Sequence, residues 1–303
     1  MPGEFDFILW LRTQQTPSAF VPVPAGDDLA VLRWDSRDLL LVGADQVLDG
    51  VHFDSRVHSP RQIGRKVMNR NLSDCAAMAC LPAAAVATVA LPKGIGVDYA
   101  RELYLGLREA ADPFDCPIVG GDTGSWEGKL GFSVTILGRS AGIAPVRRTG
   151  AMPGDGIYVT GPLGGSIRGR HMTFEPRVRL ARELAQAGGI TAMIDLSDGL
   201  SRDLGHICRE SGVGAVIEAR AVPIHDDARG LAAEECLQVA LRHQAVLDHA
   251  LNDGEDYELL FTGRPAGLPC GTVRVGSITE NRGLRLDDDG LRPLEARGWE
   301  HGL

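Results

Sequence analysis

The sequence predicts an α/β protein made of α+β layers, and three observations support this. Short apolar runs typical of buried strands alternate with longer segments of helical periodicity. The 303 residues are enough for two domains with sizeable cores. Glycine and proline become dense after residue 147, where turns surround one short strand. We therefore expect two domains, residues 1–147 and 148–303.

The first half contains four apolar runs that predict strands, with helix-like segments between them. These runs are "DLLLVGADQV", "AAAVATVALP", "CPIVGGD" and "GFSVTILGRS". In chain order, the expected elements are a strand at 38–47, a helix at 60–80, a strand at 83–92, a helix at 97–111, and strands at 116–122 and 131–140.

The second half repeats this alternation and ends in a hairpin. The tail "GLRLDDDGLRPL" has Asp and Gly at its centre, which is the turn chemistry of a hairpin. In chain order, we expect a strand at 156–160, a helix at 175–187, a strand within "MIDLSDGL", a helix at 200–211, a strand at 214–219, a helix near 234–246, a strand in "YELLFTG" and the hairpin at 283–294.

Composition excludes several functional classes. A net charge of −9 argues against nucleic acid as a partner, because phosphate backbones attract basic surfaces. No apolar run reaches the ~20 residues of a membrane span. The start "MPGEFDFILWLR" is acidic before it is apolar, unlike a signal peptide. Six cysteines without a CxxC pair indicate reduced, mostly buried thiols. We expect a cytoplasmic protein.

Aspartate recurs in glycine-containing turns after apolar runs. One such residue is usually a turn former or a helix cap, but six segments of this kind in one chain predict a shared role. Carboxylate oxygens suit Mg²⁺ or Ca²⁺, and Mg²⁺ commonly bridges a few carboxylates to substrate phosphates. We favour Mg²⁺, because "DDDG" lacks the rest of a calcium loop. The residues are Asp27, Asp28, Asp45, Asp49, Asp74, Asp122, Asp195, Asp198, Asp253, Glu255 and Asp256.

The helix that starts at Pro60 places polar groups on an apolar face. Ile63, Val67, Asn71 and Asp74 follow one another at spacings of four, four and three, so they share one side. If this side faces inward, Asn71 and Asp74 line a cleft. The alternative is that Asp74 caps a second helix beginning at Cys75.

The stretch "MIDLSDGL", residues 193–200, inserts two carboxylates into an apolar run. An unpaired buried carboxylate is costly, so Asp195 and Asp198 call for a metal or a partner. The stretch is expected to end a strand and to start a helix at about Leu200. Asp198 as a simple helix cap is the alternative. The surrounding residues expected inside the sheet are Val159, Met193, Ile194 and Leu196.

Familiar phosphate-binding and catalytic signatures are missing from the sequence. It contains no GxxxxGK[ST] loop, no kinase HRD or DFG set, no GxSxG and no HExxH. If the chain handles nucleotide phosphates, it must use metal ions on carboxylates, glycine-rich backbone amides and an arginine.

The ordered motifs resemble those of thiamine-monophosphate kinases, from residue 3 to the C-terminus. That family belongs with aminoimidazole ribonucleotide synthetase, selenophosphate synthetase and a hydrogenase maturation protein. The motifs are "GDDLAVL", "GADQVLDGVHF", "VMNRNLSDCAAMACLP", "GGDTGS", "RRTGAMPGDGIYVTGPLG", "IDLSDGLSRDLGHI", "GEDYELLFT" and "RGWEHG".

The resemblance implies a two-domain aminoimidazole ribonucleotide synthetase-like fold whose N-terminal domain pairs in a homodimer. It implies transfer of the γ-phosphoryl group of ATP directly onto thiamine monophosphate, with several Mg²⁺ ions. The acceptor is already anionic, so charge neutralisation rather than a general base is the main task. The implied metal ligands are Asp28, Asp45, Asp74, Asp122, Asp195 and Asp198; the implied ATP-binding residues are Gly121, Asp122, Arg148 and Ser197; the implied substrate-binding residues are His52, Glu255 and Trp299; and the implied catalytic residues are Asp122, Asp198 and Arg148.

Three of these residues also have ordinary structural interpretations. Arg148 carries a fixed positive charge suited to phosphate, or it is a surface charge on a linker. Trp299 can stack on a cationic thiazolium ring, or it covers the core near a chain end. His52 follows a strand and is either a substrate contact or a satisfied structural histidine.

The chain departs from the family pattern in two places. Gly43 and Ala44 stand where relatives commonly carry hydroxyl residues, so one side-chain metal ligand is absent. The connection at residues 167–175 is also shorter than in relatives. Two alternative functions stay open: a related enzyme that uses ATP to activate a different acceptor, and a nucleotide-binding homologue without turnover.

Overall fold

The computed structural model describes residues 22–23, 27–34, 38–235, 238–265 and 267–299. The chain divides into two compact units. The N-terminal unit comprises the described residues of Ser18–Ala144 together with Met172–Val178, and the C-terminal unit those of Pro145–His171 and Arg179–Leu303. None of the described helices is both long and apolar enough to cross a bilayer. The expected α/β class is confirmed.

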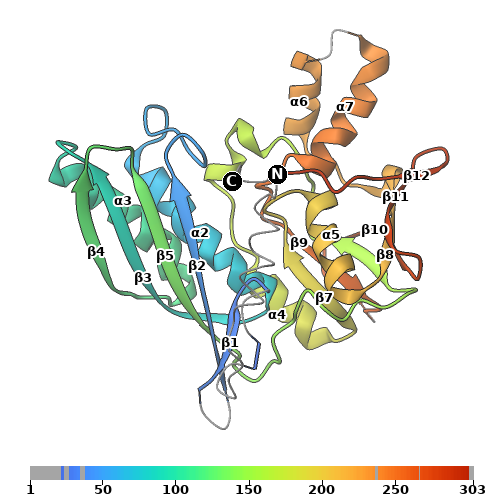
Figure 1. Ribbon diagram of the computed structural model, residues 1–303, viewed down its shortest axis with the longest axis horizontal. Coiled ribbons are helices and arrows are strands. Elements are labelled where there is room, and N and C mark those ends of the chain that lie inside the picture. Colours follow the sequence, from blue (N-terminus) through green and yellow to red (C-terminus); the bar gives the residue numbers. More distant parts are fainter. Residues whose placement is uncertain (1–21, 24–26, 35–37, 236–237, 266, 300–303) are drawn as a thin grey trace, which may run out of the picture. The chain divides into compact units, whose positions relative to one another are not determined.

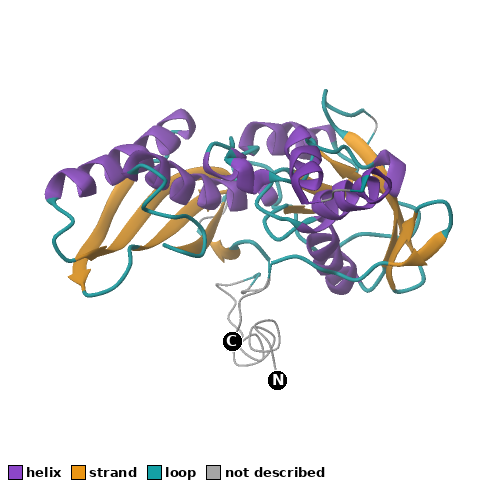
Figure 2. Cartoon of the chain, turned by 90° about the horizontal axis from the view of Figure 1, so that it is seen from above, coloured by secondary structure: helices purple, strands orange, loops and turns teal. Residues whose placement is uncertain are grey.

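The N-terminal unit is a five-stranded sheet with two helices packed on one face (Figures 1 and 2). The strand order is β1-β2-β5-β3-β4; β3 and β4 are parallel, and the other neighbours are antiparallel. Its elements are β1 (Ala30–Arg33), β2 (Leu39–Leu48), α2 (Pro60–Ala77), β3 (Leu81–Pro92), α3 (Val97–Ala111), η1 (Asp112–Phe114), β4 (Ile118–Trp126) and β5 (Gly131–Arg139).

The core of this unit lies between α2, α3 and one face of the sheet. Alternate residues of β5 are buried, as the period of two in a strand requires. They meet Ile63 and Val67 of α2, which are fully buried. The two helices approach closely because glycines stand where they cross: a Cβ added at Gly64 would lie 2.1 Å from the Leu103 oxygen, and one at Gly106 would lie 2.1 Å from the Arg61 oxygen.

The C-terminal unit is a seven-stranded mixed sheet in the order β12-β11-β8-β10-β6-β9-β7. Helix α5 packs on the sheet, and α6 and α7 form a helical pair next to it (Figure 1). Its elements are β6 (Gly156–Val159), η2 (Ser166–Arg168), η3 (Arg170–Met172), α4 (Val178–Ala187), β7 (Ile190–Asp195), α5 (Leu200–Ser211), β8 (Gly214–Glu218), η4 (Ala219–Ala221), α6 (Asp226–Glu235), α7 (Val239–Asn252), β9 (Leu259–Gly263), β10 (Val273–Thr279), β11 (Gly283–Asp287) and β12 (Leu291–Pro293).

Most expected elements are present, and the differences have local causes. The helix predicted near 234–246 is present as α7, although it begins later, at Val239. The separate helix α6 was missed; it begins at Asp226, where two acidic residues favour a helix N-terminus. Helix α4 begins at Val178 rather than 175, because the residue before Pro176 is disfavoured in helical geometry. The tail hairpin β11–β12 is confirmed.

The described cysteines have free thiols, as expected, and four of them are buried: Cys75, Cys80, Cys116 and Cys208. Cys270 is exposed, which the expectation of mostly buried thiols allows. Cys236 and residues 1–21 lie outside the described part of the chain.

Candidate active site

The "DLSDG" loop, residues 195–199, leaves the end of β7, an apolar strand at one edge of the C-terminal sheet. Strand β7 ends at Asp195, which is only 3% exposed, and α5 begins at Leu200. The flanking residues Met193, Ile194 and Leu196 are buried, as the sequence predicted, and so is Val159 of β6. The loop therefore carries two carboxylates from the buried end of β7 to the start of α5.

Backbone hydrogen bonds hold this loop against the segment that precedes β9. Leu196 N–H donates to the Glu258 oxygen at 2.8 Å, and Tyr257 N–H donates to the Leu196 oxygen at 2.8 Å. Glu255 N–H donates to the Ser197 oxygen at 2.7 Å. The two stretches, about sixty residues apart in sequence, are thus fixed side by side.

A third segment reaches the same loop from the chain end. Trp299 N–H donates to the Asp198 oxygen at 3.1 Å, and the Trp299 side chain is 48% exposed. The structural alternative for Trp299, a cover over the core, is disfavoured by this exposure. Five predicted site residues thus gather within the C-terminal unit: Asp195, Ser197, Asp198, Glu255 and Trp299.

Asp203 is a functional candidate that the sequence analysis missed. It lies in the first turn of α5, is 1% exposed, and one of its oxygens, Oδ2, accepts the N–H groups of Asp198 and Gly199 at 3.1 Å each. Burial raises the pKa of Asp203 well above its usual range, and the charges of Asp198 and Asp195 act in the same direction. The alternative role of Asp198 as the helix cap is wrong, because the N-cap of α5 is the next residue, Gly199.

Arg148 contributes positive charge beside this acidic group. Its charge lowers the pKa of Asp203, against the stronger effect of burial. Burial lowers the pKa of His206 to about 3, and the charges of Arg148 and Arg209 add to this effect. The His206 imidazole is therefore neutral at pH 7, the form that binds metal ions. Ligand atoms of Asp198, Asp203 and His206 lie within 4.8 Å of one another.

A second acidic pair lies in the N-terminal unit. Carboxylate oxygens of Asp28 and Asp74 are within 4.8 Å of each other, and both residues are half-buried. Helix α2 runs without a break through Asp74 to Ala77, so the alternative of a second helix starting at Cys75 is wrong. Two carboxylates this close repel each other unless a proton or cation lies between them.

Asn71 supports the inward orientation predicted for this helix face. Its side chain is fully buried, and its Nδ2 donates to the Val67 oxygen at 3.0 Å. Among the described residues, no donor reaches its Oδ1. A buried acceptor without a partner indicates a position where a ligand or water completes the bonding.

Asp45 is paired within its own unit. Its Oδ2 lies 2.9 Å from Nε of Arg70 on α2. Arg70 is another residue that the sequence analysis did not select. A Cβ at Gly43 would lie 2.3 Å from a terminal carbon of the Leu29 side chain, which would have to shift, whereas Ala44 is exposed.

Gly121 and Asp122 lie on β4, at the edge of the sheet. A Cβ at Gly121 would lie 1.9 Å from the Ala87 oxygen of the neighbouring strand, so close strand pairing already requires glycine here. Asp122 is exposed. It belongs to neither of the acidic groups found among the described residues.

His52 is buried and bonded to its own chain. Its Nδ1 accepts the Leu48 N–H at 3.0 Å, and its backbone oxygen accepts Nζ of the fully buried Lys66 at 2.5 Å. These bonds agree with the structural interpretation of His52.

Oxygen donors dominate these sites, and this chemistry fits Mg²⁺. Within each unit, carboxylates are brought closer than their charges favour, and a hard divalent cation prefers such ligands. In the C-terminal unit Asp195 and Asp198 follow directly after a buried strand, and in the N-terminal unit Asp28 and Asp74 converge.

Comparisons with known proteins agree with the ordered motifs. Residues 26–140 match the model of the AIR synthase related protein N-terminal domain, and residues 152–260 match that of the C-terminal domain. A thiamine-monophosphate kinase of Rhodopirellula baltica is 39% identical over 320 residues, covering 99% of this chain and 97% of the relative.

Solved structures show the same similarity. The structure of AaThiL complexed with AMPPCP and TMP is 28% identical and has a TM-score of 0.85, covering 99% of this chain and 97% of that one. A crystal structure of thiamine monophosphate kinase from Aquifex aeolicus is 26% identical, with a TM-score of 0.75, covering 93% and 95%.

Proposed function

We propose, because this chain belongs to the family of thiamine-monophosphate kinases, that it uses ATP to phosphorylate thiamine monophosphate and produces thiamine diphosphate and ADP. The observation that carries this is the 39% identity to a kinase of that name over 99% of the chain. The structural similarity to AaThiL, complexed with an ATP analogue and TMP, supports both substrates.

The proposed reaction joins two anionic groups, and the side chains suit that task. A phosphate oxygen of thiamine monophosphate attacks the γ-phosphorus, the bond to the ADP oxygen breaks, and ADP leaves with the electron pair. No base is needed, because the attacking oxygen carries no proton to remove at neutral pH. The acidic side chains instead serve to hold cations, and Arg148 places a fixed positive charge beside the "DLSDG" loop.

We propose that Mg²⁺ is bound by the carboxylates that the motifs identify. Bound Mg²⁺ supplies neutralisation of phosphate charge. The close oxygens of Asp28 and Asp74 support a metal role for that pair. The full proposed set is Asp28, Asp45, Asp74, Asp122, Asp195 and Asp198 for metal; Gly121, Asp122, Arg148 and Ser197 for ATP; His52, Glu255 and Trp299 for thiamine monophosphate; with Asp122, Asp198 and Arg148 as the catalytic residues.

We also keep three wider proposals. The domains comprise residues 1–147 and 148–303.

The N-terminal domain forms a homodimer. The residues along β4 are exposed and β4 is an edge strand, and a sheet edge of this kind can pair with a second copy. The chain works in the cytoplasm, a proposal supported by free thiols at Cys75, Cys80, Cys116, Cys208 and Cys270.

The first experiment is a product assay. The purified chain is incubated with ATP, MgCl₂ and thiamine monophosphate, and products are separated by chromatography. We expect thiamine diphosphate and ADP in equal amounts. ADP without thiamine diphosphate would favour a related enzyme with another acceptor, and ATP binding without any turnover would favour a silent homologue. Either result refutes the proposal.

Variants test the metal ligands. Asp122→Ala and Asp198→Ala should each lose turnover while retaining the circular dichroism spectrum of the wild type. Asp98→Ala is a matched control, because Asp98 is an exposed residue of α3 in a surface ion pair with Arg101. Retained turnover in both Asp122→Ala and Asp198→Ala would show that the metal ligands are misassigned.

A further inference from the structure

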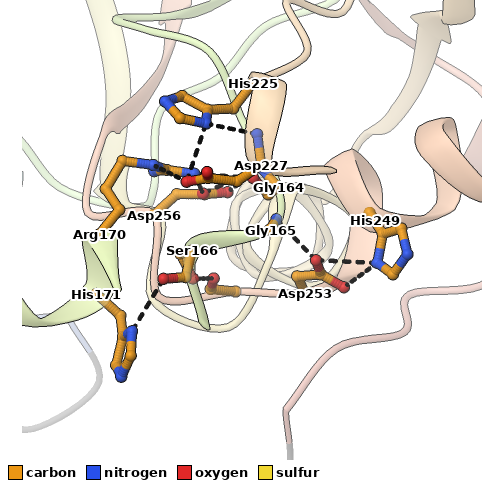
Figure 3. A network of polar contacts seen from close by, with 11 residues as sticks. Gly164, Gly165, Ser166, Arg170, His171, His225, Asp227, His249, Asp253 and Asp256 are labelled. Carbon is orange, nitrogen blue, oxygen red and sulfur yellow. Dashed lines mark hydrogen bonds and ion pairs between the residues drawn. The ribbon is translucent and has the colours of Figure 1, made fainter. Parts of the chain in front are cut away.

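A glycine-rich loop in the C-terminal unit is bonded, residue by residue, to an acidic turn. We call residues 161–166 the glycine loop and residues 253–257 the acidic turn. Three successive residues of the loop bond to the turn (Figure 3). Gly164 N–H lies 3.0 Å from both carboxylate oxygens of Asp256, Gly165 N–H lies 2.8 Å from Oδ2 of Asp253, and Ser166 Oγ lies 2.8 Å from the Gly254 oxygen.

Two positions of the glycine loop, Gly164 and Gly165, have no room for a side chain. Gly164 and Gly165 have φ angles of 88° and 74°, which favour glycine. A Cβ at Gly164 would lie 2.7 Å from the backbone nitrogen of Ala250 in α7. A Cβ at Gly165 would lie 2.4 Å from that of Ala228 in α6. The loop is therefore fixed between the two helices.

Arg170 completes the connection around Gly164. Its Nη2 lies 3.0 Å from Oδ1 of Asp256 and 2.8 Å from the Gly164 oxygen, and its Nε lies 3.6 Å from Oδ2 of Asp227 in α6. Arg170 and Asp256 together thus bind both the N–H and the C=O of Gly164. Arg170 lies in the connection between the glycine loop and α4, and it ties that connection to the acidic turn.

The acidic turn holds an unusual backbone conformation on both sides of Asp256. Glu255 and Tyr257 have φ angles of 52° and 51°, in the left-handed region that disfavours residues with side chains. Such a conformation costs about 1–3 kcal/mol per residue and persists only when its surroundings fix it. The N–H groups of both residues bond to the "DLSDG" loop, through Ser197 and Leu196.

We propose that Asp256 and Arg170 are positioning residues for substrate binding: they hold the acidic turn in the conformation that presents Glu255 to thiamine monophosphate. This rests on the proposed function, in which Glu255 contacts that substrate. Asp256 is 3% exposed and cannot itself reach solvent-borne substrate, so it acts through its neighbour. Asp253 and Asp256 bond to the glycine loop, and Glu255 lies between them in the chain. Their bonds therefore restrict the backbone position from which the Glu255 side chain extends.

The charge balance at Asp256 explains why Arg170 is needed. Burial raises the pKa of Asp256 to about 7, and the charge of Asp253 adds to this, whereas Arg170 and Gly164 N–H lower it. Asp227 also faces Arg170, and the Asp227 N–H donates to Nδ1 of His225 at 3.1 Å. Removing Arg170 would therefore raise the pKa of Asp256 further above its usual range and weaken the charge-assisted bond that the carboxylate accepts from Gly164 N–H.

The test is a set of steady-state kinetic measurements on full-length variants. Asp256→Ala and Arg170→Met should raise KM for thiamine monophosphate at least about tenfold while KM for ATP changes less than about twofold, because only one substrate meets Glu255. Arg170→Lys should recover most of the loss. Arg168→Met is the matched control, since Arg168 forms an exposed ion pair with Glu234 of α6, and it should match the wild type.

A double-mutant cycle separates positioning from independent effects. Glu255→Ala alone should raise KM for thiamine monophosphate, and adding Asp256→Ala should raise it little further, because Asp256 acts only through Glu255. Multiplicative effects in the double variant would overturn the proposal. So would an unchanged KM for thiamine monophosphate, or equal rises in KM for both substrates, which indicate general loosening.

Folding and the proposed function are controlled separately. Melting temperatures identify variants that fail to fold, and if Asp256→Ala does so, Asp256→Asn and Arg170→Met carry the test. A wild type that makes no thiamine diphosphate refutes the proposed function. An active wild type whose folded Asp256 and Arg170 variants retain its KM for thiamine monophosphate refutes the positioning role alone.

Discussion

Replacing Asp203 tests whether one buried carboxyl holds the "DLSDG" loop through its oxygen rather than its charge. In Asp203→Ala, the N–H groups of Asp198 and Gly199 lose their shared acceptor. Each of the two donors left unbonded costs about 1–3 kcal/mol, and removing a poorly solvated carboxyl offsets part of the summed loss, so we expect a net loss of about 2–4 kcal/mol. Asp203→Asn keeps an acceptor oxygen and should lose less than about 1 kcal/mol.

The assay is urea unfolding followed by circular dichroism, in buffer with a chelator so that metal binding does not contribute. Asp248→Ala is the control, because Asp248 is an exposed residue of α7 whose carboxylate accepts a side-chain bond from Asn252. It should change the free energy of unfolding by less than about 0.5 kcal/mol. Equal losses in Asp203→Ala and Asp203→Asn would refute the acceptor argument, as would a loss in Asp203→Ala no larger than that of the control.

The same pair of variants gives a pH test with a definite sign. The pKa of Asp203 is raised in the folded state, so the native protein binds this proton more tightly than the unfolded chain. The contribution of Asp203 to stability is therefore full below its usual pKa near 4 and is lost as pH rises through the folded-state pKa. Asp203→Asn should remove this dependence, and a parallel pH profile in both proteins would contradict it.

Three further outcomes follow from packing, thiol exposure and metal use. Gly64→Val should lower the free energy of unfolding by more than about 2 kcal/mol in a urea titration, because any side chain there meets the Leu103 oxygen; wild-type stability would contradict the close helix crossing. Iodoacetamide should label Cys270 well before Cys116 and Cys208, whose pKa burial raises to about 12, as peptide mass spectrometry can check; simultaneous labelling would contradict this. EDTA should abolish phosphoryl transfer and added MgCl₂ should restore it in the product assay; turnover unaffected by EDTA would exclude the metal proposal.

Elements bounded by strong local signals were predictable from the sequence. Helix α5 occupies the expected residues because Gly199 precedes it and Gly212 ends it in the left-handed conformation. Helix α3 likewise matches its expected range. Strand β10, in contrast, was missed although it is central. Its apolar pattern is interrupted at Gly276, where a Cβ would lie 2.1 Å from the Val216 oxygen and where the strand register shifts.

The candidate site likewise contains residues that the sequence predicted and residues that it did not. Carboxylates such as Asp195 and Asp198 were found because polar residues inside an apolar run are conspicuous. Their supporting partners were not found, because those contacts join distant parts of the chain. Arg170 and Asp256 are 86 residues apart, and no spacing rule connects them. Asp203 was missed because it is not conspicuous in the sequence: an acidic residue in the first turn of a helix is common.

Strand β4 has a consequence for how the N-terminal unit assembles. It pairs in parallel with β3, so the chain must first complete the whole α3 crossover before this contact can form. Until then β3 offers an open strand edge, and afterwards β4 offers its own, since it is the last strand of the sheet. Open edges of partly folded chains join one another. Refolding yield should therefore fall as protein concentration rises, and dilution during expression or renaturation should recover it.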